Sequence, residues 1–324
     1  MAKGVKNMKH ISKKHILRNT LLSVVALILM VGLGFGLIRY REVKGSIDNS
    51  FDSAQVPNSR DTNYLIKNKK PISILLMGTS ASDFDSSYSG KTDTMMLLTI
   101  NPHTEKTTIT SIPHDLAVKI PGYNDPAQAS EAFEHGQAKA SIETVQKLLN
   151  VPVDYYALIN INGMKKVIDK VGGIDIKPTA SFNSYGYEFQ KGVKTHMDGT
   201  KALAYSKETD SSTNEYYAHV SRQGEVLAAI MHKSTSIQAL MNQDFIKTLT
   251  DEIQTDITFD DLTTIIKNYK HFTEYVDDTH IAATTKSVKG QQFEVADQKE
   301  LQRITDLIRK NLELKADTTG NEGL

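Results

Sequence analysis

The chain of 324 residues contains no cysteine and only 8 prolines. Without cysteine it has no disulfide framework, no zinc–thiolate site and no cysteine nucleophile. The absence is compatible with an exported protein, because a disulfide-free chain folds in either redox compartment. It leaves acids, histidines and basic side chains as candidates for chemistry.

Several well-known catalytic motifs are also missing. No P-loop or dinucleotide-binding fingerprint occurs, and the Gly-x-Ser at residues 78–80 lacks the second glycine of a nucleophile elbow. His219 and His232 are too far apart for two zinc ligands on one helical turn. The sequence gives no support to these nucleotide-binding and hydrolase classes.

Charge is balanced over the whole chain but unevenly distributed. There are 38 basic and 38 acidic side chains, yet the first eighteen residues hold six basic side chains and no acid. The remainder is therefore net negative, which disfavours direct nucleic-acid binding. A basic tail of eighteen residues is too short for a DNA-binding domain, so any effect on transcription would be indirect.

Residues 19–38 form one long apolar run without a charge. At about 1.5 Å per residue, twenty helical residues span the roughly 30 Å hydrocarbon core of a bilayer. The basic flank before the run predicts a cytoplasmic N-terminus, although Arg39, Arg41 and Lys44 weaken the asymmetry. A cleaved signal peptide is the alternative, but the run is long for one and lacks a small-x-small cleavage pattern. We expect a single-pass plasma-membrane protein with an extracellular C-terminal domain.

The rest of the chain alternates apolar strand patterns with amphipathic helix patterns. We predict a cytoplasmic tail (1–18), a transmembrane helix (19–38), a polar stalk (39–70), a folded domain (71–315) and a polar tail (316–324). Expected strands lie at 72–77, 95–100, 107–112, 153–159 and 174–176, and helices at about 127–149, 163–171, 197–205, 217–241, 259–269 and 296–314. This order predicts an α/β fold with a mixed central sheet flanked by helices on both faces.

Seven short motifs follow one another in a characteristic order. They are Ile74-Leu75-Leu76-Met77-Gly78, residues 91–102 (KTDTMMLLTINP), Ser111-Ile112-Pro113-His114-Asp115, Pro152-Val153-Asp154-Tyr155-Tyr156, Val171-Gly172-Gly173-Ile174-Asp175, residues 197–205 (MDGTKALAY) and Arg222-Gln223. Together they resemble the LytR-CpsA-Psr family over roughly residues 72–240. The ordered set is far more specific than any single motif.

The resemblance implies a transferase of the cell envelope. Such enzymes take an anionic glycopolymer, of teichoic acid or capsular type, from a polyprenyl-pyrophosphate lipid and join it to peptidoglycan. The lipid tail would occupy an apolar tunnel, while arginines and Mg²⁺ hold the pyrophosphate. Arginine forks match phosphate oxygens, and a divalent ion neutralises charge on the leaving phosphate. The expected partners are the polyprenyl-pyrophosphate lipid, the wall glycopolymer or peptidoglycan, and the plasma membrane.

The resemblance also assigns site residues. Asp93 and Arg222 would be catalytic, and Asp93 with Asp115 would hold the metal. The pyrophosphate set is Lys91, His114, Lys207, His219, Arg222 and Gln223. From the residues alone, Asp93 reads equally well as a loop-end cap. Arg222 can also be read as a solvated helix side chain, or as one paired with Glu225 or Glu215.

Several of these positions depart from the family's pattern. Lysine or histidine stands at Lys91, His114, Lys207 and His219, where the family has arginine. Further departures are Ser80, Ser82, Thr209 and Tyr216. Lysine lacks the planar fork, and histidine with an ordinary pKa near 6.5 is mostly neutral at pH 7. At about 1.5–3 kcal/mol for each lost contact, binding or rate would fall by several powers of ten. The alternative is a catalytically impaired paralogue that binds lipid or wall polymer and regulates envelope maintenance.

Tyrosines are a final group to weigh. Tyr155 and Tyr156 sit in a predicted strand, where aromatic rings usually pack in the core. Tyr185-Gly186-Tyr187 falls in a predicted loop and is the better candidate for stacking on a carbohydrate.

Overall fold

A computed structural model describes residues 44–45, 52–54, 56, 60–79, 88–207, 213–234, 251–269, 272, 275–288 and 290–320. The chain divides into two compact units, residues 1–45 and 46–324. The predicted transmembrane segment, 19–38, lies outside the described residues. Within the ranges given above, no helix is long and apolar enough to cross a membrane.

The larger unit is built on a six-stranded sheet in the order β11-β6-β1-β2-β3-β12. Its strands are β1 (Ile72–Thr79), β2 (Thr94–Asn101), β3 (Lys106–Ile112), β6 (Tyr155–Asn160), β11 (Ile253–Thr255) and β12 (Tyr275–His280). Strands β1, β2 and β3 form an antiparallel meander. Strands β6 and β12 are parallel to β1 and β3, and β11 is antiparallel to β6. The predicted mixed α/β sheet is confirmed.

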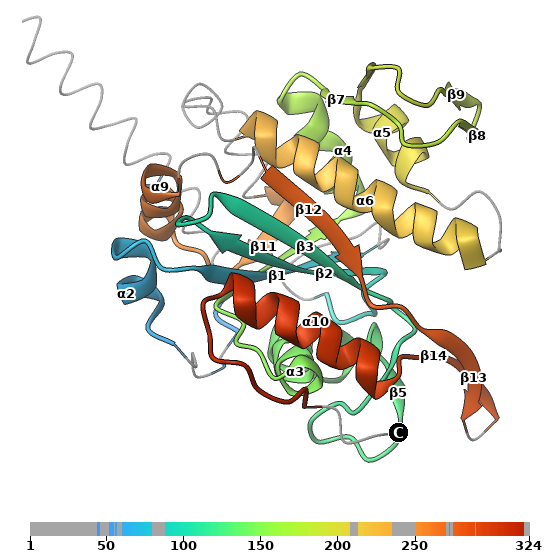
Figure 1. The fold of residues 1–324 in the computed structure, drawn as a ribbon. Helices are drawn as coiled ribbons and strands as arrows, with labels where there is room; N and C mark the ends of the chain where they lie inside the picture. The colour runs from blue at the N-terminus through green and yellow to red at the C-terminus, as the bar shows by residue number, and fades with distance from the viewer. Residues whose placement is uncertain are drawn as a thin grey trace, which may run out of the picture. The chain divides into compact units, whose positions relative to one another are not determined.

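Helices lie on both sides of this sheet (Figure 1). On one side are α3 (Glu131–Leu149) and α10 (Gln298–Asn311), over a core that includes Leu75, Met77 and Leu97. On the other are α2 (Thr62–Lys67) and α9 (Phe259–Asn268), over Ile72, Ile74 and Leu98. Successive side chains of a strand point to opposite faces, so each buried strand contributes to both cores.

A third core lies under α6 (Thr213–Ser234), α4 (Ile161–Lys170) and α5 (Gly199–Ser206). Two small sheets belong to it, β7 (Ile174–Ile176) with β10 (Thr195–Met197) and the hairpin of β8 (Phe182–Ser184) with β9 (Tyr187–Phe189). Phe189 and Tyr205 are fully buried there. This group of elements, residues 161–207 and 213–234, is the upper part of Figure 1.

The remaining strands form two further hairpins, β4 (Ala117–Val118) with β5 (Ala127–Gln128) and β13 (Thr284–Val288) with β14 (Gln291–Val295). Because residues 127–128 pair with β4, helix α3 starts at Glu131 and not at the predicted residue 127. Two segments assigned from the sequence to the stalk and tail contact the fold: α2 packs on the sheet, and the Thr319 hydroxyl donates to the Leu148 carbonyl at 2.9 Å.

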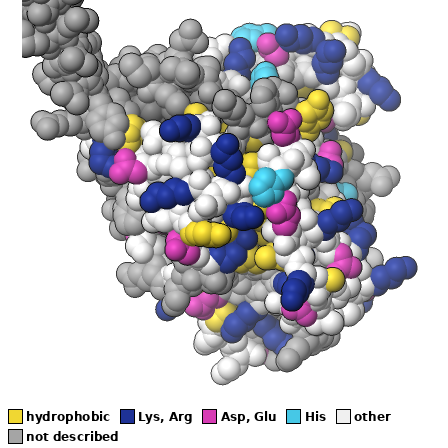
Figure 2. Space-filling view, turned by 60° about the vertical axis from the view of Figure 1, so that its left-hand side comes forward, with side chains coloured by type: hydrophobic (Ala, Val, Ile, Leu, Met, Phe, Trp, Pro, Cys, Tyr) yellow, Lys and Arg dark blue, Asp and Glu magenta, His cyan; other side chains and the backbone are white. Residues whose placement is uncertain are grey.

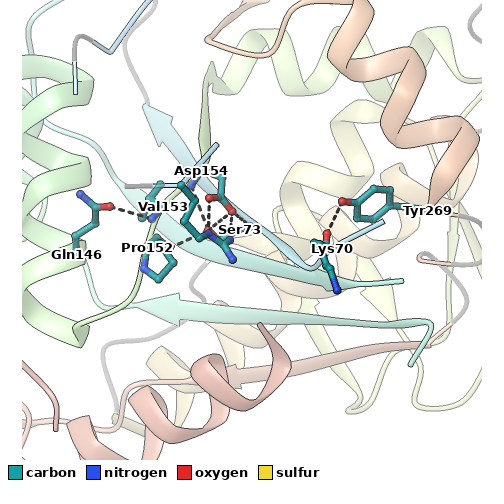
Figure 3. A network of polar contacts seen from close by, with 8 residues as sticks. Lys70, Ser73, Gln146, Pro152, Val153, Asp154 and Tyr269 are labelled. Carbon is teal, nitrogen blue, oxygen red and sulfur yellow. Dashed lines mark hydrogen bonds and ion pairs between the residues drawn. The ribbon is translucent and has the colours of Figure 1, made fainter. Parts of the chain in front are cut away.

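One end of the sheet is fastened by a buried ion pair (Figure 3). Arg60 Nε donates to Asp154 Oδ1 at 2.9 Å, and a second guanidinium nitrogen contacts Asp154 Oδ2. Oδ2 also accepts from the Ser73 backbone N–H at 2.8 Å and from its hydroxyl at 3.0 Å. The Asp154 side chain is 1% exposed, so these contacts replace its water. They join residue 60 to the starts of β1 and β6.

The surface of the described part is mixed in charge. Figure 2 shows basic and acidic side chains interspersed on one face, with hydrophobic side chains in small separate areas. Such a surface is ordinary for a folded domain. A functional site must therefore be sought in particular contacts.

Candidate functional site at one end of the sheet

The first part of the candidate site is the junction between β1 and β2. The Asp93 N–H donates to the Gly78 carbonyl at 2.8 Å, and Thr94 then pairs with Gly78 across the two strands. A side chain at Gly78 would lie 3.2 Å from Thr94 Cβ, so the strands approach closely here. Asp93, which is exposed, is thereby held at the carboxyl end of β1.

A second loop and the start of α3 meet this junction. The Ser130 N–H donates to the His114 carbonyl at 2.8 Å, while the Ser130 carbonyl accepts from the Thr92 N–H at 3.2 Å. Lys91 Nζ forms an ion pair with Glu131 at 2.6 Å, and this hydrogen bond raises the pKa of Lys91. Main-chain bonds through Ser130 therefore place the loops around residues 91–93 and 113–115 next to each other.

Asp115 supplies a carboxylate in this corner. Its Oδ1 is buried and, like Thr92 Oγ1, has no hydrogen-bond partner within the described residues. A buried acceptor without a donor is costly unless a ligand completes it. Among the residues the structure describes, no group of three or more His, Cys, Asp or Glu side chains is arranged to hold a metal ion. Mg²⁺ commonly uses one or two carboxylates together with substrate phosphates, and Asp115 offers one unpartnered carboxylate oxygen of that kind.

Helix α6 reaches the same corner through its polar face. Thr94 Oγ1 donates to Gln223 Oε1 at 3.4 Å, and Gln223 Nε2 lies 2.9 Å from His219 Nε2. His219 and Gln223 are one helical turn apart, so they share a face. This contact joins Gln223, and through it His219, to Thr94, the residue after Asp93.

Arg222 lies on a neighbouring side of α6 and is 4% exposed. One terminal nitrogen, Nη2, donates to the Lys207 carbonyl at 2.9 Å, and the guanidinium carbon lies 4.5 Å from the centre of the Phe182 ring. Glu225, the acid proposed from the sequence as its helix partner, accepts from the Tyr205 hydroxyl and from Thr179 at 3.3 Å. The guanidinium is thus packed into the third core beside the polar face of α6.

Lys207 is the C-cap residue of α5. Its Nζ lies 4.6 Å from the centre of the Tyr185 ring. Lys207 and Arg222 form one cluster. A second cluster consists of the loops that carry Lys91, Asp93, His114 and Asp115. His219 and Gln223 of α6 contact this second cluster through Thr94. The predicted pyrophosphate set occupies two adjoining clusters that α6 connects.

Sequence reasoning did not find three residues that shape the site. Ser130 joins the loops through its backbone, Glu131 pairs with Lys91 from 40 residues away, and Thr94 contacts Gln223 from 129 residues away. The Ser-Glu pair at the helix start is a recognisable N-terminal signal, but it marks a helix and not a site. The other contacts carry no local signal.

Comparison with known proteins agrees with these motifs and their arrangement. The profile of the LytR_cpsA_psr family matches residues 39–310. The chain belongs to the LytR_cpsA_psr family. A relative from Enterococcus faecalis, named polyisoprenyl-teichoic acid–peptidoglycan teichoic acid transferase TagU, is 29% identical over 90% of this chain and 96% of its own length. The protein of that name from Bacillus subtilis is 28% identical over 93% of this chain and 97% of its own.

A solved structure extends the agreement to three dimensions. Protein gbs0355 from Streptococcus agalactiae superposes with a TM-score of 0.70 at 28% identity, covering 81% of this chain and 94% of that protein. The likeness to gbs0355 therefore covers most of the fold as well as the sequence.

Proposed function

We propose that this LytR_cpsA_psr member is a cell-envelope glycopolymer transferase. It would move an anionic polymer, of teichoic acid or capsular type, from a polyprenyl-pyrophosphate lipid to peptidoglycan. The observation that carries the proposal is the corner formed by Lys91, Asp93, His114 and Asp115 with Gln223 of α6 beside it. The names of the transferase relatives support the same reaction class.

The reaction balances as a phosphoryl transfer. An acceptor hydroxyl of peptidoglycan attacks the glycan-side phosphorus, the bond to the bridging oxygen breaks, and polyprenyl monophosphate leaves. In this proposal the exposed Asp93 would accept the hydroxyl proton, while Lys91, Lys207 and Arg222 would supply positive charge for the phosphates. We propose Mg²⁺ at Asp93 and Asp115, where it would offset the charge of the pyrophosphate.

The test uses the full-length chain in detergent micelles, with a polyprenyl-pyrophosphate-linked glycan and peptidoglycan. Release of polyprenyl phosphate and label on the peptidoglycan, both dependent on Mg²⁺, are the expected result. An arginine-complete family member assayed alongside fixes the upper limit. If that protein turns over and this one gives no product at any Mg²⁺ concentration, the transferase proposal is wrong.

A second function rests on a specific observation, the position of Arg222. Its guanidinium is buried against Phe182 and the Lys207 carbonyl, and the arginines usual for the family are histidine or lysine at four other positions. A paralogue that binds polyprenyl lipid or wall polymer without turning it over would have these features. It predicts lipid copurifying with the chain, and a gain in pyrophosphate affinity when His114 and His219 are changed to arginine.

We also propose that residues 19–38 anchor the protein in the plasma membrane with the C-terminal domain outside. The support is the uncharged apolar run and the basic residues before it. Protease added to intact cells should then digest the domain and leave the tail. Digestion only after lysis, or release of the protein by an alkaline wash, would contradict this placement.

A further inference from the structure

The tip of the β8–β9 hairpin carries a tyrosine that the fold does not require. Tyr185 is 68% exposed, and it and Gly186 have φ angles of 46° and 83°. Two residues with positive φ between paired strands form a type I′ turn, which favours Asn-Gly or Gly-Gly. A bulky side chain in this left-handed region costs about 1 kcal/mol or more. The turn does not favour tyrosine, and the exposed ring gains no stability from burial. A tyrosine at this position therefore points to a role in binding.

The base of the same hairpin is held firmly beside Arg222. Ser184 Oγ donates to the Ala204 carbonyl of α5 at 2.6 Å, and the Phe182 ring lies 4.9 Å from the Phe189 ring. Arg222 stacks on Phe182 from the other element, α6. The hairpin that carries Tyr185 is therefore hydrogen-bonded to α5 and packed against Arg222 of the candidate phosphate cluster.

Two lysines accompany the aromatic rings of this hairpin. Lys207 Nζ lies 4.6 Å from the centre of the Tyr185 ring, and Lys201 Nζ lies 6.0 Å from that of Tyr187. The Lys207 backbone carbonyl is the one that Arg222 contacts. The surface next to the Arg222–Lys207 contact therefore carries an ammonium group and an exposed aromatic ring.

Rings and ammonium groups side by side select a particular chemistry. The C–H face of a sugar ring stacks on an aromatic ring, whereas a phosphodiester pairs with lysine ammonium groups. An uncharged glycan would leave the lysines unused, and free phosphate would leave the ring unused. We propose that Tyr185, together with Lys207 at the edge of the candidate pyrophosphate cluster, binds a sugar-phosphate segment of an anionic glycopolymer next to the pyrophosphate. That the polymer arrives on a lipid-linked donor rests on the proposed function. That this surface binds the polymer does not depend on it.

The test measures binding to the full-length chain in detergent by calorimetry. The probe is a lipid-free poly(ribitol phosphate) oligomer that carries N-acetylglucosamine. Tyr185→Asn should weaken this binding about tenfold, since an aromatic stacking contact is of that size. Tyr185→Phe should retain it. Asparagine suits the type I′ turn, so the variant should unfold at the same or a higher temperature, which separates lost binding from lost folding. Tyr64→Asn removes another exposed tyrosine, 55% accessible on α2, and should leave binding unchanged.

A second titration uses polyprenyl pyrophosphate without any sugar. Binding of the oligomer that depends on Tyr185, in a chain that does not bind the lipid, would support the subsite and contradict the transferase. Lipid binding together with equal oligomer affinity in the parent chain and Tyr185→Asn would overturn the subsite alone. Equal affinity for the oligomer and for poly(ribitol phosphate) without sugar would also overturn it.

Discussion

The two ends of the central sheet are built in opposite ways. At the end where β1 and β6 begin, Asp154 is buried and its two oxygens receive Arg60, the Ser73 N–H and the Ser73 hydroxyl. At the end where β1 finishes, Asp93 is exposed and Asp115 Oδ1 is buried without a donor in the described chain. Completed polar contacts stabilise a fold, while incomplete ones leave capacity for a ligand. From this contrast we propose that the Asp154 end mainly stabilises the fold and that the Asp93 end binds the ligand.

The largest effect on stability should come from breaking the completed end. Asp154→Ala removes the partner of a partly buried guanidinium and leaves the Ser73 N–H without its acceptor. We expect a loss of about 3–5 kcal/mol in unfolding free energy, or failure to fold at 37 °C. Urea titration followed by circular dichroism measures it. A loss under about 1 kcal/mol would show that the network does not fasten the sheet.

The second effect concerns the open end, and it should fall on turnover alone. Asp93→Asn keeps the size of an exposed side chain but removes a proton acceptor and metal ligand, so transfer should drop at least about a hundredfold. Unfolding free energy should change by less than about 0.5 kcal/mol. Glu105→Gln is the control, because Glu105 lies in the β2–β3 turn at the other end. Lost stability in Asp93→Asn without lost turnover would reverse the assignment of the two ends.

How far the sequence reaches differs between the fold and the site. Strands β1, β2 and β6 are predictable because their apolar runs are short and bounded by turn residues, and β3 because its threonines and isoleucines are β-branched. Strand β12, with Asp277 and Asp278, has a polar surface pattern, and only its pairing with β3 makes it a strand. Long-range pairing of that kind is invisible to local periodicity.

Within the candidate site, the spacing of the sequence motifs predicts only part of the arrangement of the side chains. The family resemblance assigned Asp93 and His114 to one site, but the atoms that join their loops are the backbone groups of Ser130, which no side-chain pattern marks. The packing of Arg222 on Phe182 likewise depends on the hairpin folding back over α6. Side-chain identity indicates the candidate residues, and the fold determines which of them lie next to one another.

A third prediction concerns the pH dependence of stability at the Asp154 end of the sheet. Asp256 accepts from the Tyr156 N–H at 2.8 Å; burial, and then the nearby carboxylates Asp261 and Asp154, raise its pKa to about 7. The folded chain holds this proton between about pH 4 and 7 while the unfolded chain has released it, so unfolding free energy falls as pH rises through that range.

Asp256→Asn keeps an acceptor oxygen for the Tyr156 N–H and replaces the titrating carboxyl group with a neutral amide. Relative to the parent chain, the variant should gain about 2 kcal/mol as pH rises from 5 to 8, seen as diverging melting temperatures. Asp306→Asn, an acid on α10, is the control and should follow the parent. Parallel curves for Asp256→Asn and the parent would mean that Asp256 is ionised throughout.

The smallest effect on stability is expected at Lys91. Its side chain is 48% exposed, so its ion pair with Glu131 is worth at most about 1 kcal/mol. The hydrogen bond that Lys91 donates to Glu131 raises the pKa of Lys91, so the ammonium group stays charged, and the pair is intact, throughout the physiological range. Lys91→Gln should therefore barely alter the melting temperature, yet weaken polyprenyl-pyrophosphate binding a few-fold, more so at low salt. Glu131→Gln offers the matched test: it removes the pair but keeps the cation, so binding should be retained or strengthened. If both variants weaken binding equally, the ion pair itself shapes the corner, and Lys91 belongs with the stabilising contacts of the other end.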